Sequence, residues 1–126
     1  MTARVLAWVL EQLQRNSPVV LATVVGVKGS VPGKSGARLA MNRFQDWVGT
    51  VGGAGLEHRI LNRCKELIGE SKATSEVHTF GLNKGAKGYE VQPLDSLCGG
   101  QVTISLELML PMPHILLMGG GHCSEA

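Results

Sequence analysis

The chain has few aromatic residues, no long apolar run and almost no net charge, and each of these excludes a class of protein. Only five of its 126 residues are Trp, Tyr or Phe, so the core must be mainly aliphatic. No apolar run reaches the roughly 18 to 20 residues that a membrane-spanning helix needs. The formal charge is +2 and the basic residues are scattered, which argues against binding to nucleic acid. We expect a cytoplasmic protein that contacts neither membrane nor nucleic acid.

Cysteine is also scarce. The three cysteines, Cys64, Cys98 and Cys123, are odd in number and form no C-x-x-C motif. This pattern fits neither a disulfide framework nor a tetrahedral zinc site. We therefore predict no metal site and at least one free thiol.

Aliphatic residues and glycines are plentiful. Hydrophobic residues make up 44% of the chain and charged residues 17%, with 17 glycines. This composition excludes disorder throughout. The length allows one compact domain, or one domain and a short stub of another.

The first two predicted elements are a helix and a buried strand. Val5, Val9 and Leu13 recur at helical spacing with Leu6 beside them, so residues 3–16 should form an amphipathic helix. Its polar residues should cover the opposite face, and they are Arg4, Glu11, Gln12, Gln14 and Arg15. The unbroken aliphatic run at residues 19–27 predicts a central strand covered on both faces.

A glycine-rich loop at residues 28–36 precedes a second apolar strand at residues 37–41. Another short strand is predicted at residues 47–51. The glycine turn at residues 52–55 then leads into an apolar stripe at helical spacing, which consists of Leu56, Ile60, Cys64, Leu67 and Ile68. The glycines therefore lie at a strand-to-helix turn.

The second half of the chain predicts two more strands, at residues 76–80 and 101–109, and the latter alternates polar and apolar residues as a half-buried strand does. Residues 114–121 are typical of the first strand and glycine turn of a dinucleotide-type βαβ unit, whose helix would need more residues than remain. We predict an α/β fold, a mixed β-sheet with two main helices, in residues 1–110. Residues 111–126 would be a hinge and the first strand of a missing Rossmann-like domain.

Three segments are candidates for carrying chemistry. The turn at residues 52–55 can offer backbone amides and a helix N-terminus to an anion, and Glu57 can accept hydrogen bonds from amino groups. Spacing alone favours a packing role for the glycines and a helix-dipole role for Glu57. The loop from Gly29-Ser30 to Gly36 has two lysines and suits an anionic ligand. It lacks the first glycine of a P-loop, however, and its composition alone favours an ordinary surface turn.

Cys98 is the third candidate, because backbone N–H groups around Gly99 and Gly100 can stabilise a thiolate. The alternative is a small apolar residue beside a turn, since free cysteines are usually buried. Cys64 lies on the apolar helix stripe and should be a core residue. His58 and His78 have no partner at a readable spacing and should be surface or capping residues.

Five motifs in this order resemble the XdhC/CoxI family, whose members are accessory factors of molybdenum hydroxylases such as xanthine dehydrogenase. The motifs are Gly29-Ser-Val-Pro32, Ser35-Gly-Ala-Arg-Leu-Ala-Met41, Gly49-Thr-Val-Gly-Gly-Ala-Gly-Leu-Glu57, Cys98-Gly-Gly-Gln-Val102 and His114-Ile-Leu-Leu-Met-Gly-Gly-Gly-His122. The resemblance covers nearly the whole chain.

The resemblance implies a maturation factor rather than an enzyme. Such a protein binds molybdenum cofactor (molybdopterin), protects it while a cysteine desulfurase supports its sulfuration, and delivers it to the apo-form of a xanthine dehydrogenase-type enzyme. The cofactor-binding residues that it implies are Gly29, Ser30, Gly52, Gly53, Gly55, Glu57, Cys98, Gly99 and Gly100, with Cys98 as the functional thiol.

Two other classes remain open. A nucleotide-binding enzyme subunit could use Gly119 to Gly121, but the crossover helix and the downstream acidic residue are lacking. A non-catalytic interaction module could pair its terminal strand, residues 114–118, with a partner. The aliphatic residues 115–118 also lead us to expect a homodimer.

Overall fold

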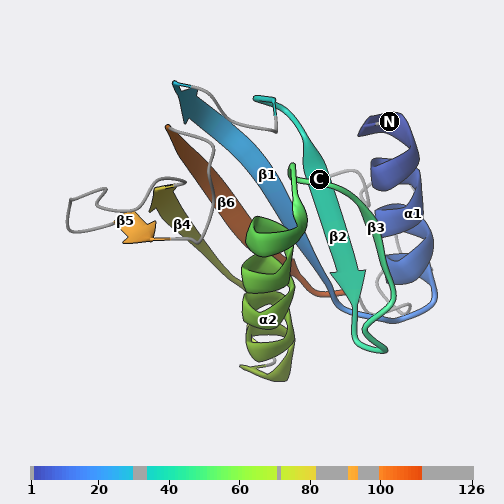
Figure 1. Cartoon of the computed structure of the whole chain (residues 1–126). Coiled ribbons are helices and arrows are strands. Elements are labelled where there is room, and N and C mark those ends of the chain that lie inside the picture. The colour runs from blue at the N-terminus through green and yellow to red at the C-terminus, as the bar shows by residue number, and fades with distance from the viewer. Residues whose placement is uncertain (1, 30–33, 71, 82–90, 94–99, 112–126) are drawn as a thin grey trace.

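A computed structural model describes residues 2–29, 34–70, 72–81, 91–93 and 100–111, with all their side chains except those of residues 54 and 91–93 (Figure 1). Its elements are α1 (Thr2–Gln14), β1 (Val19–Lys28), β2 (Arg38–Asn42), β3 (Trp47–Gly49), α2 (Ala54–Glu70), β4 (Thr74–Gly81), β5 (Val91–Pro93) and β6 (Gln101–Met109). The segment at residues 111–126, predicted to begin a second domain, lies almost wholly outside the described residues.

The strands form one six-stranded sheet in the order β3-β2-β1-β6-β4-β5. Neighbouring strands are antiparallel except β4 and β5, which are parallel. This confirms the predicted α/β fold with a mixed sheet and two main helices. No helix in the described ranges is both long and apolar enough to cross a membrane.

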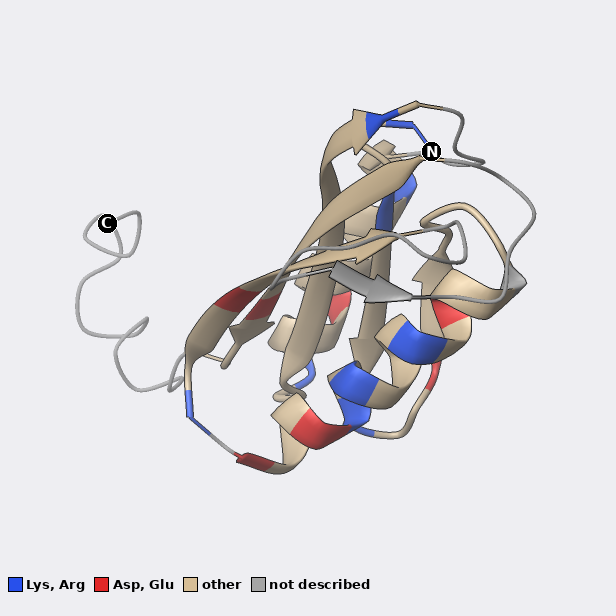
Figure 2. Ribbon diagram, turned by 60° about the vertical axis from the view of Figure 1, so that its left-hand side comes forward, with Lys and Arg blue, Asp and Glu red and all other residues tan. Residues whose placement is uncertain are grey.

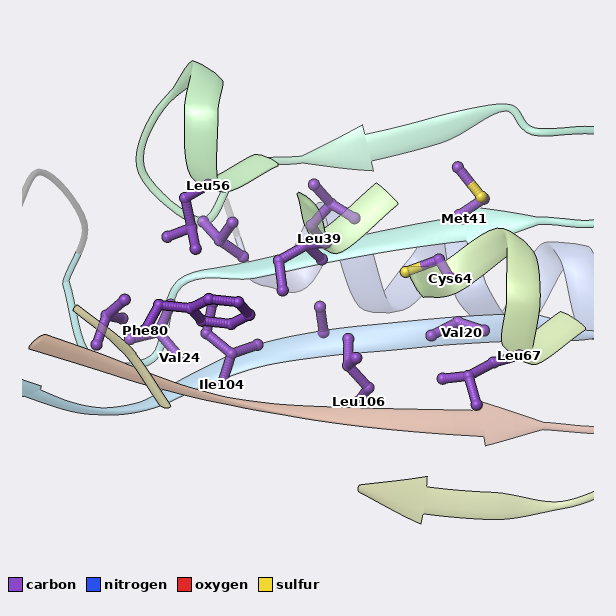
Figure 3. Packing of buried hydrophobic residues seen from close by; sticks show 14 of the residues in the cluster. Val20, Val24, Leu39, Met41, Leu56, Cys64, Leu67, Phe80, Ile104 and Leu106 are labelled. Atoms are coloured by element: carbon purple, nitrogen blue, oxygen red, sulfur yellow. The ribbon is translucent and has the colours of Figure 1, made fainter. Parts of the chain in front are cut away.

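The two helices pack on opposite faces of the sheet. Val5 and Val9 of α1 form a small core with residues of β1 and β2. On the other face, Leu56, Cys64 and Leu67 of α2 point toward the sheet and form the larger core (Figure 3). Each fully buried aliphatic side chain contributes about 1.5 to 3 kcal/mol to stability. These two cores therefore hold the three layers together.

Strand β1 belongs to both cores. Val19 and Leu21 pack on the α1 side, whereas Val20, Ala22 and Val24 pack on the α2 side. The prediction of a central strand covered on both faces at residues 19–27 is thus confirmed for residues 19–24, because alternate side chains of a strand point to opposite faces. It is wrong for the end of the strand, where Val25 and Val27 are exposed because the strand extends past the helices. Strand β6 has only one buried face in the described part of the chain, as its alternation predicted.

Gln12 is the main correction to the predicted helix. Its side chain is only 7% exposed, whereas Leu6 and Leu10 are 44% and 56% exposed. Positions 5, 9 and 12 follow i, i+4 and i+7 spacing and share one face of a helix. Gln12 therefore lies on the buried stripe, and the prediction that it covers the polar face is wrong.

The predicted strand at residues 47–51 ends two residues early, at Gly49. Gly49 has a φ of +87°, and the Thr50 N–H donates to the Arg38 carbonyl at 3.0 Å. Thr50 and Val51 thus belong to the turn before α2 rather than to β3. The three-residue strand β5 was not predicted, because so short a segment carries no readable periodicity.

Candidate functional site

The described glycine motifs lie toward one end of the sheet. Lys28 pairs with Gln101, which places Gly29 and Gly100 at neighbouring strand ends. The bond from Thr50 N–H to the Arg38 carbonyl places the turn before α2 at the start of β2. The first residue of β6, Gln101, pairs with Lys28 at the end of β1, whereas the first residue of β2, Arg38, pairs with Thr23, five residues earlier in β1 (Figure 1). Both positions lie toward the same end of the sheet. We call this the glycine end of the sheet.

Glu57 anchors the turn that leads into α2. Its Oε2 atom accepts hydrogen bonds from the Thr50 hydroxyl and, at 3.2 Å, from the Val51 N–H. The Gly52 N–H in turn donates to the Thr50 hydroxyl oxygen at 3.1 Å. The Oε2 atom thus serves this loop, and the role of Glu57 toward the amino groups of a ligand stays a prediction.

The residue at the start of α2 carries no side chain that could cap the helix. Gly53 accepts from the Glu57 N–H at 2.8 Å and therefore occupies the N-cap position, where it has no side chain to offer. Within the described residues, no side chain accepts a hydrogen bond from the N–H groups of residues 54 to 56. These N–H groups and the helix dipole together favour an anion.

Gly55 leaves room at this turn. It is exposed, and a Cβ atom added there would have no neighbouring atom within 4 Å. Gly52 has a φ of +128°, a conformation that glycine adopts far more readily than other residues. The turn can therefore expose its backbone to a ligand.

Basic residues flank the glycine end without forming a continuous patch. Lys28 and Lys34 are exposed, and the Arg38 side chain donates to the Gly36 carbonyl at 3.2 Å. Figure 2 shows basic residues at the tip of β1 and both basic and acidic residues along α2. The cations are thus available to one small anionic group rather than to a polymer.

A hollow of about 230 Å³ adjoins Gly29 and Gly100. Lys28, Gln101 and Thr103 line it together with Thr79, whose hydroxyl lies 3.0 Å from that of Thr103. In β6 these residues alternate with Val102 and Ile104, which pack against α2. The hollow and the turn before α2 therefore lie at the same end of the sheet but on opposite faces.

Three of the predicted site residues, Ser30, Cys98 and Gly99, lie outside the described residues, as does Cys123. Cys64 is fully buried in the core, and burial raises the pKa of its thiol to about 12. This confirms its predicted core role. The described part of the chain contains no group of three or more potential metal ligands.

An ion-pair cluster between α2 and β4 was missed. The Glu76 carboxylate accepts from Arg63 Nε at 2.6 Å and from a terminal nitrogen of Arg63 at 2.8 Å. It also lies 2.6 Å from His78 Nε2, so the prediction that His78 has no readable partner is wrong. The sequence did indicate the contact between Glu76 and His78, because residues two apart in a strand point to the same face. The hydrogen bonds from Arg63 and His78 lower the pKa of Glu76 to about 2.

Comparison with known proteins identifies the family. The model of the XdhC and CoxI family matches residues 12–81, which is more than half of the chain, and the chain belongs to this family. It is 26% identical over 113 residues to the uncharacterized protein YqeB of Escherichia coli (strain K12), which covers 90% of this chain.

A solved structure has the same fold. It is described as a xanthine dehydrogenase from Bacillus halodurans and matches 80% of this chain with a TM-score of 0.61 at 24% identity. The present chain spans only 20% of the Escherichia coli protein and 29% of the Bacillus halodurans chain. The whole-protein properties of these relatives therefore do not transfer directly.

Proposed function

We propose that this chain is a maturation factor, not an enzyme, that binds molybdenum cofactor, supports its sulfuration and delivers it to a xanthine dehydrogenase-type enzyme in the cytoplasm. Membership of the XdhC and CoxI family indicates a role in the maturation of molybdenum hydroxylases. The observation that supports the finer proposal is the placement of Gly29 and Gly100 at adjacent strand ends, with the turn before α2 toward the same end of the sheet.

The residues at the glycine end fit the chemistry of such a cofactor, which joins a pterin to a phosphate. The N–H groups at the start of α2 suit the phosphate, and the exposed Lys34 can neutralise its charge. Backbone amides around Gly52 and Gly53 can contact the pterin, and Gly29 and Gly100 belong to the proposed site from the adjacent strand ends. In the client enzyme the bound metal would supply the redox chemistry, and the role of this chain is to hold the group and exclude water from it.

Cys98 is the proposed functional thiol, flanked by Gly99 and Gly100, and Ser30 belongs to the same proposed site. The proposed partners are a cysteine desulfurase, which would provide the sulfur, and the apo-form of the hydroxylase. Both partners follow from the family resemblance.

A charge introduced at Gly55 tests the binding site. Gly55→Glu adds a carboxylate at the proposed phosphate position, while Gly55→Gln adds the same bulk without charge. An acidic side chain is favourable in the first turn of a helix, so neither variant should unfold the protein. Gly69→Glu is the matched control at the far end of α2, where an added Cβ also has no neighbour within 4 Å.

The measurement is retention of molybdenum cofactor after gel filtration, followed by molybdenum content and by the fluorescence of the oxidised pterin. We expect Gly55→Glu to retain at least about tenfold less cofactor than Gly55→Gln, because repulsion of the phosphate costs more than about 1.4 kcal/mol. If Gly55→Glu and Gly69→Glu retain equal amounts of cofactor, the glycine end is not the binding site.

A thiol substitution tests the role of Cys98. In Cys98→Ser, the cofactor should no longer be sulfurated when the chain is incubated with a cysteine desulfurase and cysteine. Cys64→Ala removes the buried thiol instead and should leave sulfuration intact. Unchanged sulfuration in Cys98→Ser would show that this thiol has no such role.

A further inference from the structure

A second hollow lies at the opposite end of the sheet from the glycine motifs. It measures about 390 Å³ and lies between the C-terminal part of α1 and the turn that joins β2 to β3. Its lining includes Trp8, Gln12 and Arg15 from α1. Such a volume falls within the range of small-molecule sites.

Buried polar side chains concentrate at this hollow. Gln12, Ser17 and Asn42 are 7%, 2% and 3% exposed, and they are the buried polar residues of the described chain. All three line the hollow. Burying an amide costs free energy unless it is hydrogen-bonded, so each amide group there needs a partner or access to solvent.

The hydrogen bonds determine which way the two amides point. Asn42 Oδ1 accepts from the N–H groups of Phe44 and Asp46 at 2.9 and 3.0 Å, and only an oxygen can accept both. Asn42 Nδ2 must therefore be the donor to Gln12 Oε1 at 2.9 Å. Consequently the other end of the Gln12 amide is Nε2, which carries two N–H donors.

These donors reach the hollow. No hydrogen bond joins Gln12 Nε2 to the described residues, and among those residues no side-chain polar atom is both fully buried and unpaired. Nε2 thus keeps access to solvent although the residue as a whole is nine-tenths buried, and the hollow that Gln12 lines provides that access. The site offers a preorganised donor to a ligand that brings an acceptor.

The other residues that line the hollow indicate which class of ligand it could bind. Trp8 and Phe44 supply flat apolar surface, and Asp46 supplies a hydrogen-bond acceptor. Arg15 forms an ion pair with Glu11 at 2.8 Å, and the Arg43 guanidinium lies 5.2 Å from the centre of the Phe44 ring. Two guanidinium groups therefore balance the two carboxylates of Glu11 and Asp46. This balance of charge attracts neither an anion nor a cation, so neutral rings are the best match.

We infer that this hollow binds a small, neutral, planar ring with a carbonyl oxygen beside a ring N–H group. Gln12 Nε2 donates to the carbonyl, a carboxylate on the rim accepts from the ring N–H, and the ring lies against Trp8 and Phe44. The inference does not depend on the proposed function, because the two sites lie at opposite ends of the sheet.

The first test compares two rings of similar shape. 2-Pyridone carries the carbonyl and the N–H, whereas 2-fluoropyridine lacks both, and each is titrated into ¹⁵N-labelled protein. For so small a probe we expect a dissociation constant on the order of 1 mM. 2-Pyridone should shift the NMR signals of the Gln12 side-chain NH₂ and the Trp8 indole. No shift at these signals, or equal shifts with both rings, would overturn the inference.

The second test replaces the Gln12 amide nitrogen, a hydrogen-bond donor, with a carboxylate oxygen, which is an acceptor. Gln12→Glu keeps an oxygen to accept from Asn42 Nδ2 but presents no donor to the hollow. It should weaken 2-pyridone binding about tenfold, the cost of one or two hydrogen bonds. Gln14→Glu makes the same change at an exposed position of α1 and should bind normally. Unchanged binding in Gln12→Glu would refute the site.

If Gln12→Glu does not fold, a substitution at an exposed residue, Phe44→Ala, tests the same hollow. Phe44 is 67% exposed, so Phe44→Ala should leave the fold intact. It should weaken binding several-fold because stacking surface is lost. Full binding in Phe44→Ala would contradict the proposed stacking.

Discussion

Gly49 occupies a position that no other residue can take without strain. Its φ is +87°, and an added Cβ would lie 2.2 Å from the Arg38 carbonyl oxygen and 3.0 Å from a methyl group of Val5. Gly49→Ala should therefore lower the free energy of unfolding by at least about 2 kcal/mol in urea titrations. Gly69→Ala, in a helix with no atom near the added methyl, should raise it by about 0.5 to 1 kcal/mol. Equal stability of the two variants would contradict the tight packing at Gly49.

The Glu76 carboxylate should make stability depend on pH in the acid range. Its pKa is about 2 in the folded chain and 4.5 in the reference state, so between these values the unfolded chain binds more protons. Stability from this group is complete above about pH 4.5 and is lost as the pH falls toward 2. At pH 7, Glu76→Gln should destabilise the protein by about 1 to 3 kcal/mol, and the difference should nearly vanish at pH 2.

The control for this variant is Glu66→Gln. Glu66 also pairs with Arg63, at 2.8 Å, but its side chain is 66% exposed, against 22% for Glu76. An exposed pair contributes little, so Glu66→Gln should cost no more than about 1 kcal/mol. A Glu76→Gln effect that persists undiminished at pH 2 would show that its cause is not the charge.

At the scale of elements, the apolar stripe of α2 carries the larger core. Leu67 is fully buried, whereas Leu10 of α1 is 56% exposed. Leu67→Ala should lower the free energy of unfolding by about 2 to 5 kcal/mol, because it removes buried contacts and leaves a cavity. Leu10→Ala, the same change on an exposed surface, should stay within about 0.5 kcal/mol of the parent. Thermal or urea unfolding measures both, and equal losses would contradict the packing of α2.

Most elements could be predicted because their signals are local. The unbroken aliphatic run of β1, the helical stripe of α2 and the alternation of β6 all reflect which faces become buried. The glycine turn before α2 was equally readable. What local pattern did not reveal was the burial of Gln12, because an amide on an apolar stripe is stable only when Asn42, thirty residues away, donates to it.

At the scale of the whole molecule, the prediction of a homodimer stays open, because residues 112–126 lie outside the described part. Residues 115 to 118 are large and aliphatic. If they stayed in water, the protein would forgo about 1.5 to 3 kcal/mol of stabilisation for each of these side chains. Light scattering should give a dimer for the intact chain and a monomer for a chain ending at Leu110. A monomer in both cases would exclude this strand from assembly.

The sequence by itself determined the class of the fold, the positions of the main elements and the family. Hydrophobic periodicity, glycine turns and ordered motifs can each be recognised from residues that are close together in the sequence. Tertiary structure alone decided the strand order, the edge strand β5 and the pairing that sets Gly29 beside Gly100. It also decided the Arg63–Glu76–His78 cluster and the polarity of the Gln12 amide. These features depend on contacts between residues far apart in sequence. Strand register determines those contacts, and no local sequence pattern reveals the register.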